Sequence, residues 1–211
     1  MDKPGEHVSC LKWVGVIFSV CLIYSFIRYI TLGPEDLSQL PLYVMNKALS
    51  WAGLATIGLS RLLGHAAARK QAGLIGALMI GLHVVMSLLV LKPEYLRKIF
   101  DSMNGMKLTG AGEASMLAGV LAGVLGLGFI AWLHWATAAK ANGSSDSNGN
   151  GSLLPRVGRA VLICGALQVA LMGWDIWFAS EKWKNYGHLP PITLLSFVTA
   201  VVFLFLRRRR A

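Results

Sequence analysis

Charged residues are scarce in this sequence. Asp, Glu, Lys and Arg make up 14% of its 211 residues, whereas soluble globular domains carry about 25%. Hydrophobic residues make up 55% of the chain, and they occur in blocks of about twenty, the length at which a helix crosses the hydrocarbon layer. The short alternating segments of a membrane β-barrel do not occur. The sequence therefore predicts an all-α, polytopic integral membrane bundle surrounded by the lipid bilayer.

Cysteine is also scarce, with Cys10, Cys21 and Cys164 as its three positions. There is no CxxC pair and no Cys/His spacing typical of zinc, so the sequence predicts neither a disulfide framework nor a zinc site. Ser/His/Asp arrangements and phosphate-binding loops are missing as well. If the protein takes part in redox chemistry, a cofactor must supply it.

A net charge of +10 could indicate a nucleic-acid partner, but the distribution of the basic residues argues against one. Most of them flank the apolar blocks, and four form the terminal run 207–210. This pattern is typical of membrane orientation. We therefore expect partners among lipids and other membrane protein subunits, and no nucleic acid.

Six apolar segments are predicted to span the membrane within a single domain, 1–211. They cover about residues 12–30, 41–63, 72–91, 115–139, 158–179 and 191–206. Lys and Arg are more frequent in the termini and loops on the N-terminal side than in the opposite loops, which predicts that both termini are cytoplasmic. The bacterial inner (cytoplasmic) membrane is the expected location.

Two of the predicted connections have distinct characters. The Gly-, Ser- and Asn-rich stretch at about 140–156 is typical of a flexible cytoplasmic linker. The stretch at about 93–104 contains "PEYLRKIFDSM", whose apolar residues recur at helical spacing. It predicts a short amphipathic helix lying on the outer membrane surface.

Polar side chains inside the predicted spans are costly and therefore informative. Lys47 and Asp175 lie at similar depths, and we predict an ion pair between them. Arg28 is an alternative partner for Asp175, and separate snorkelling of each side chain to the interface is a third possibility. Gln168 lies deeper and is predicted to form a hydrogen bond across helices.

Two histidines lie within predicted spans. His83 is central to the uncharged stretch "AGLIGALMIGLHVVMSLLVL", and His134 continues the small-residue face that includes Gly119 and Gly123. A haem held by both imidazoles requires them at matched depth, yet their predicted depths differ by roughly 10 Å. Other readings are ligation of a haem or chlorophyll by His83 alone, or a packing role in which His83 donates to a carbonyl or hydroxyl.

Residues 40–91 resemble the ferric-reductase-like transmembrane domain family. The resemblance lies in "LPLYVMNKALSWAGLATIGLSRLLG", the basic turn "HAAARKQAGLIG" and "LMIGLHVVMSLLVL", and it is greatest to the haem-binding membrane subunit of the bacterial methionine sulfoxide reductase system. It implies about six spans and a haem-ligating role for His83. The family's further haem histidines lie in and just before the fifth span, where "VGRAVLICGALQVALMGWDIWFASEKW" contains none.

Two functions follow from this reading. The first is an accessory, structural subunit of a membrane protein complex, related to haem-binding electron-transfer subunits but lacking the fifth-span histidines. The alternative is a haem-binding electron-transfer subunit that uses His83, with His134. The expected cofactor is accordingly haem b, a (bacterio)chlorophyll, or none. A small transporter would require inverted repeats or broken helices, which the sequence does not indicate.

Overall fold

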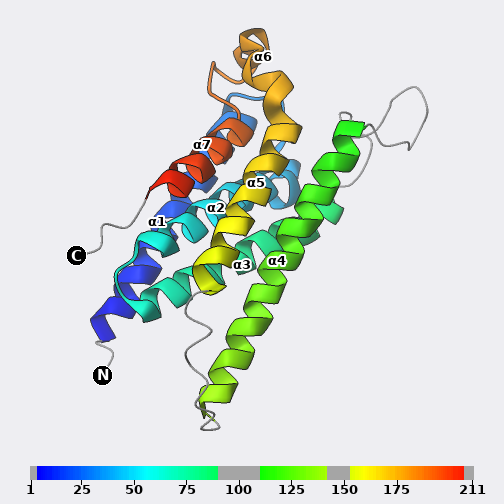
Figure 1. The fold of residues 1–211 in the computed structure, drawn as a ribbon. Coiled ribbons are helices and arrows are strands. Elements are labelled where there is room, and N and C mark those ends of the chain that lie inside the picture. The colour runs from blue at the N-terminus through cyan, green and yellow to red at the C-terminus, as the bar shows by residue number, and fades with distance from the viewer. Residues whose placement is uncertain (1–3, 90–109, 142–152, 207–211) are drawn as a thin grey trace.

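The computed structural model describes residues 4–89, 110–141 and 153–206 (Figure 1). These residues form helices and short connections, with no strand among them, so the all-α prediction is confirmed. The elements are α1 (Pro4–Phe26), η1 (Ile27–Thr31), η2 (Leu37–Gln39), η3 (Leu40–Val44), α2 (Met45–Leu62), α3 (Ala66–Leu89), α4 (Gly110–Ala141), α5 (Leu153–Trp177), α6 (Ser180–Lys184) and α7 (Ile192–Phe205). η1 and η3 are π-helical turns, and η2 is a 3₁₀ turn.

Within the described residues, three helical segments are long and apolar enough to cross a membrane: Cys10–Thr31, Ala66–Leu89 and Gly158–Trp177. Two shorter apolar helices, Gly112–Gly126 and Ile192–Phe205, accompany them. Their length and composition support an integral membrane protein. The count of six spans stays a prediction.

The most polar of the long helices, α2, lies at the centre of the bundle. It contacts α1, α3, α5 and α7, whereas α4 stands at one side against α3 and α5 (Figure 1). Asn46 and Thr56 of α2 are buried in the bundle. Helix α2 is thus shielded by its neighbours, as expected for a helix whose polar side chains are costly to expose to lipid.

Close packing joins α2 to α3 at mid-length. A Cβ atom at Gly53 would lie 2.8 Å from Ile80 Cγ1, and one at Gly76 would lie 2.7 Å from Ile57 Cγ1. Because neither glycine has a side chain, the two backbones can approach closely. Ile57 and Ile80 also belong to an apolar core to which α5 and α7 contribute Leu162 and Ala200.

The helices extend beyond several predicted boundaries. Helix α3 begins at Ala66 instead of residue 72, and α5 begins at Leu153 instead of residue 158. Pro155 fits in the first turn of α5, where backbone N–H groups have no helical acceptor. The predicted linker at 140–156 is therefore too long at both ends, since α4 continues to Ala141. The predicted amphipathic segment at 93–104 and the rest of the linker lie outside the described residues.

The first and last helices, α1 and α7, run in opposite directions (Figure 1). Tyr24 Oη donates a hydrogen bond to Pro190 O at 2.6 Å, which places the end of α1 beside the start of α7. The start of α1 and the end of α7 therefore both lie at the end of the bundle remote from α6 (Figure 1). This arrangement is compatible with termini on one side of a membrane, and the identity of that side stays a prediction.

Candidate functional site

A hydrogen-bonded group of three polar side chains joins α2 to α3. His83 Nδ1 lies 2.6 Å from Asn46 Oδ1 and 3.1 Å from the Asn46 backbone oxygen. Asn46 Nδ2 in turn donates to Ser87 Oγ at 3.0 Å. Since a backbone carbonyl only accepts, Nδ1 carries the ring proton, and Nε2 of the neutral ring is an acceptor. The contact with a carbonyl agrees with the packing role considered for His83, and the choice between packing and cofactor ligation stays a prediction.

This group lies at the wall of an open cavity of about 140 Å³ that residues of α2, α3, α4, α5 and α7 line. Its apolar lining includes Met116 and Met172. The polar side chains that line it are Tyr43, Asn46, Lys47, Ser50, His83, Ser87, Ser115, Gln168, Thr193 and Ser196. Among the described lining residues there is no Asp or Glu. The cavity is therefore rich in hydrogen-bonding groups and carries no negative side chain in its described wall.

Two polar atoms at the cavity have no protein partner among the described residues. Ser196 is 1% exposed, and its Oγ accepts and donates no hydrogen bond. The described hydrogen bonds of His83 all involve Nδ1, which leaves Nε2 unmatched. A buried polar atom without a partner, such as Ser196 Oγ, costs about 1–3 kcal/mol and calls for an explanation in a native fold. A molecule bound in the cavity is one explanation.

A π-helical turn, η3, lies directly before α2 at the edge of the cavity. The turn η3 ends one residue before α2 and supplies Tyr43 to the lining. The Lys47 ammonium lies 5.2 Å from the centre of the Tyr43 ring, within the range of a cation–π contact. Isolated π turns often mark functional sites, since they re-aim side chains at a cost in backbone geometry.

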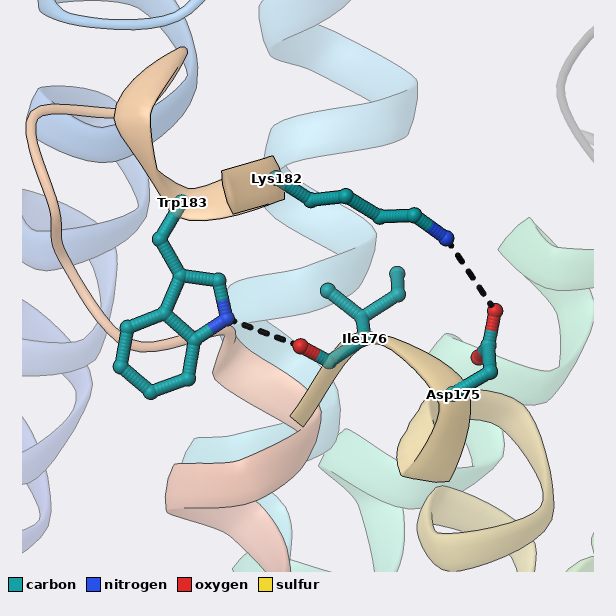
Figure 2. Close-up of polar contacts among 4 residues, drawn as sticks. All are labelled: Asp175, Ile176, Lys182 and Trp183. Atoms are coloured by element: carbon teal, nitrogen blue, oxygen red, sulfur yellow. Dashed lines mark hydrogen bonds and ion pairs between the residues drawn. The ribbon is translucent and has the colours of Figure 1, made fainter. Parts of the chain in front are cut away.

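Asp175 lies near a partner that the sequence did not suggest. Its Oδ2 is 3.9 Å from Lys182 Nζ, and Lys182 belongs to the short helix α6 (Figure 2). Trp183 Nε1 donates to Ile176 O at 2.8 Å, which folds α6 back onto the end of α5 (Figure 2). The ion pair between Lys47 and Asp175 stays a prediction.

Arg28, the alternative partner proposed for Asp175, is buried at the α6 end of the bundle. It is 2% exposed, and its Nη1 donates to Leu189 O. The guanidinium carbon lies 4.5 Å from the centre of the Tyr186 ring. Burial raises the pKa of the Tyr186 phenol, and nearby Glu35 adds to this effect while Arg28 opposes it. The neutral ring therefore stacks on the cation, and Arg28 ties η1 to the loop before α7.

The pairing of His83 with His134 as haem ligands stays a prediction, and only the backbone of His134 is described. The part of α4 that faces α3 near His83 includes Gly123, where a Cβ would lie 3.4 Å from Val84 Cγ2. His134 follows Gly123 by 11 residues along α4, or about 16 Å at the helical rise. Its side chain lies outside the described residues. The backbone separation gives the His83–His134 pair no support.

The size of the cavity limits the cofactors that His83 could hold alone. Pockets for drug-sized ligands measure about 300–1,000 Å³, and a tetrapyrrole is larger than such ligands. The cavity of about 140 Å³ is smaller than such pockets, and a haem or chlorophyll at His83 stays a prediction. In the part of the chain that the structure describes, no group of three or more His, Cys, Asp or Glu is placed to hold a metal ion.

Sequence reasoning found His83 and missed most of its surroundings. Asn46, Ser87 and Ser196 line the same cavity and were not singled out. Ser87 could have been noticed, because it follows His83 by four residues and so lies on the same helical face. No pattern in the sequence predicts that Ser196 lines the cavity, because its position there depends on how α7 packs on α2.

No model of a known protein family matches the chain, and no curated protein is significantly similar to it. The resemblance to the ferric-reductase-like transmembrane domain family therefore stays a prediction.

Proposed function

We propose that the protein is a non-catalytic, accessory subunit of a membrane protein complex, and that the cavity around His83 is its binding site for a small molecule. The cavity itself carries this proposal. It places ten polar side chains inside an otherwise apolar bundle, and one of them, Ser196, has a buried Oγ without a partner among the described residues. Polar groups at such a position are expensive and are kept where they bind or pair with something.

We further propose six spans with both termini in the cytoplasm of a bacterial cell. The shared side of the α1 start and the α7 end supports an even number of crossings, and the distribution of Lys and Arg supports the orientation. Fusions at residue 146, residue 100 and the C-terminus test it. Green fluorescent protein should fluoresce at residue 146 and the C-terminus, and alkaline phosphatase should be active only at residue 100. The opposite pattern would refute the orientation.

A cavity-filling variant tests the binding site. Ser196→Leu places a larger apolar side chain into the cavity, whereas Val198→Leu changes an exposed position on the same helix. Toluene is a suitable probe, because an engineered cavity of about 150 Å³ binds benzene. Toluene should raise the melting temperature of purified wild-type protein and Val198→Leu, and leave that of Ser196→Leu unchanged. Equal shifts in all three proteins would exclude this cavity as the site.

The role as a subunit has a separate test. In native membranes solubilised with a mild detergent, the protein should migrate in an assembly of defined stoichiometry with other membrane proteins. Recovery as a monomer at native expression levels would contradict this part of the proposal.

A haem-binding electron-transfer subunit is the second candidate. The observation in its favour is that His83 Nδ1 is anchored to Asn46, because metal-ligating histidines commonly donate their other ring N–H to a carbonyl. The small cavity counts against it. A Soret band that His83→Ala removes would support the haem, and a colourless purified protein would exclude it.

A further inference from the structure

We infer that the cavity selects molecules with a hydroxyl group on a single six-membered ring, and that this hydroxyl donates a hydrogen bond to His83 Nε2. The inference rests on the proposed function, because it names the ligand class for the same binding site. It follows from the hydrogen-bonding roles of the cavity atoms, the size of the cavity and its opening.

The hydrogen-bonding roles begin with the anchored ring. The Asn46 carbonyl at 3.1 Å fixes the proton of neutral His83 on Nδ1, so Nε2 offers a lone pair. A ligand that satisfies this atom must bring an O–H or N–H donor. A ligand with carbonyl oxygens alone would leave Nε2 without a hydrogen-bond donor.

Hydroxyl groups on α7 can form hydrogen bonds with the same ligand oxygen or with another one. Trp177 Nε1 donates to Thr193 Oγ1 at 3.0 Å, so the Thr193 hydroxyl proton remains available for a further acceptor. Ser196, one turn further along α7, has an unmatched Oγ. A hydroxyl oxygen both donates and accepts, and it therefore suits a cavity with an acceptor on α3 and hydroxyl groups on α7.

The size of the cavity favours one ring. Its volume of about 140 Å³ is close to that of the engineered cavity of about 150 Å³ that holds benzene. Met116 and Met172 flank the space. Methionine side chains adapt to irregular shapes and form favourable contacts with aromatic rings, so an aromatic ring is well accommodated.

The cavity reaches the side of the bundle between α3 and α4. Leu88 and Val120 line it, and both are also exposed, at 61% and 52%. A para-substituted apolar tail could therefore leave the ring toward lipid while the hydroxyl stays at His83. We accordingly expect an amphiphilic phenol to bind more tightly than phenol itself.

Three ligands that share a butylbenzene framework test the inference on the full purified chain in detergent. They are 4-butylphenol, its methyl ether 4-butylanisole, and butylbenzene. Dissociation constants come from calorimetric titration. Wild-type protein should bind the phenol about tenfold more tightly than the ether, which corresponds to one net hydrogen bond. His83→Ala should reduce this preference to less than twofold. Leu82→Ala, at an exposed neighbouring position on α3, should keep it.

The ligand comparison in wild-type protein does not depend on a variant that folds. Equal affinity for all three ligands would overturn the inference and leave the binding site intact. A preference that persists in folded His83→Ala would also overturn it. Phenol that binds as tightly as 4-butylphenol would show that the ligand does not extend to lipid. Failure of these ligands together with toluene would instead refute the proposed function.

Discussion

The interface between α2 and α3 has two halves with opposite properties. In one half, Gly53 and Gly76 let the backbones approach so closely that an added Cβ would meet an isoleucine at 2.7–2.8 Å. In the other half, toward the α6 end, Asn46 and His83 hold the helices through hydrogen bonds and border a cavity. We infer that the close contact at the glycines determines where α2 and α3 cross. The cavity beside the polar half is then available for binding.

Substitution in the glycine half should have the largest effect on stability. In Gly76→Leu, the new side chain would collide with Ile57, whose side chain and backbone nitrogen lie 2.7 and 3.0 Å from the added Cβ. We expect a loss of about 2–3 kcal/mol, typical of overpacking, measured by denaturation in detergent. Gly81→Leu is the control, because a Cβ there meets nothing within 4 Å. Equal losses in both variants would show that the close approach is unimportant.

Substitution in the polar half should affect stability less and binding more. Asn46→Ala removes the amide that contacts His83 and Ser87, and we expect a loss of about 1–3 kcal/mol. Without Asn46 the His83 ring is no longer held in place, so the variant should also lose its preference for 4-butylphenol over 4-butylanisole. Ser50→Ala lines the same cavity and should change stability by less than about 0.5 kcal/mol. A preference unchanged in Asn46→Ala would show that Asn46 does not orient the ring.

Substitution on α7, where it faces α2, should have a smaller effect on stability. Trp51 Nε1 donates to Thr199 Oγ1 at 2.9 Å. Thr199→Val keeps the shape and removes the acceptor, so we expect a loss of about 1 kcal/mol by denaturation. The binding of toluene should not change, because neither residue lines the cavity. A change in binding without a change in stability would indicate that α7 shifts relative to the cavity.

The charged rim outside the interface should matter least. Lys182 and Asp175 are 58% and 36% exposed at their side chains, and exposed pairs contribute about 0–1 kcal/mol. Lys182→Ala should therefore lower the melting temperature slightly, and less so at high salt. Asp175→Asn should lower the melting temperature by a similar amount if Lys182 is the principal partner of Asp175. A loss several times larger in Asp175→Asn would support the predicted pair with Lys47.

The sequence was informative where a single helix carries the signal. The apolar blocks predicted α2 and α7 to within a few residues, and the uncharged surroundings of His83 predicted an imidazole that faces other helices, where it contacts Asn46 of α2. The partner of His83 could not be read in this way, because Asn46 lies 37 residues away and meets it only through the crossing of two helices. The 16 Å between Gly123 and His134 along α4 likewise depends on which turn of α4 faces α3, which periodicity does not define.

The most direct test compares the reactivity of two cysteines in a background without Cys10, Cys21 and Cys164. Ser50→Cys lies at the cavity, and Ala77→Cys lies in the closed, glycine half of α3, where Ala77 is 2% exposed. A small methanethiosulfonate reagent should modify Ser50→Cys in the folded protein, 4-butylphenol should slow this reaction, and Ala77→Cys should stay unmodified. Equal rates at both positions, unaffected by the phenol, would contradict the division of the interface into a closed half and a binding half.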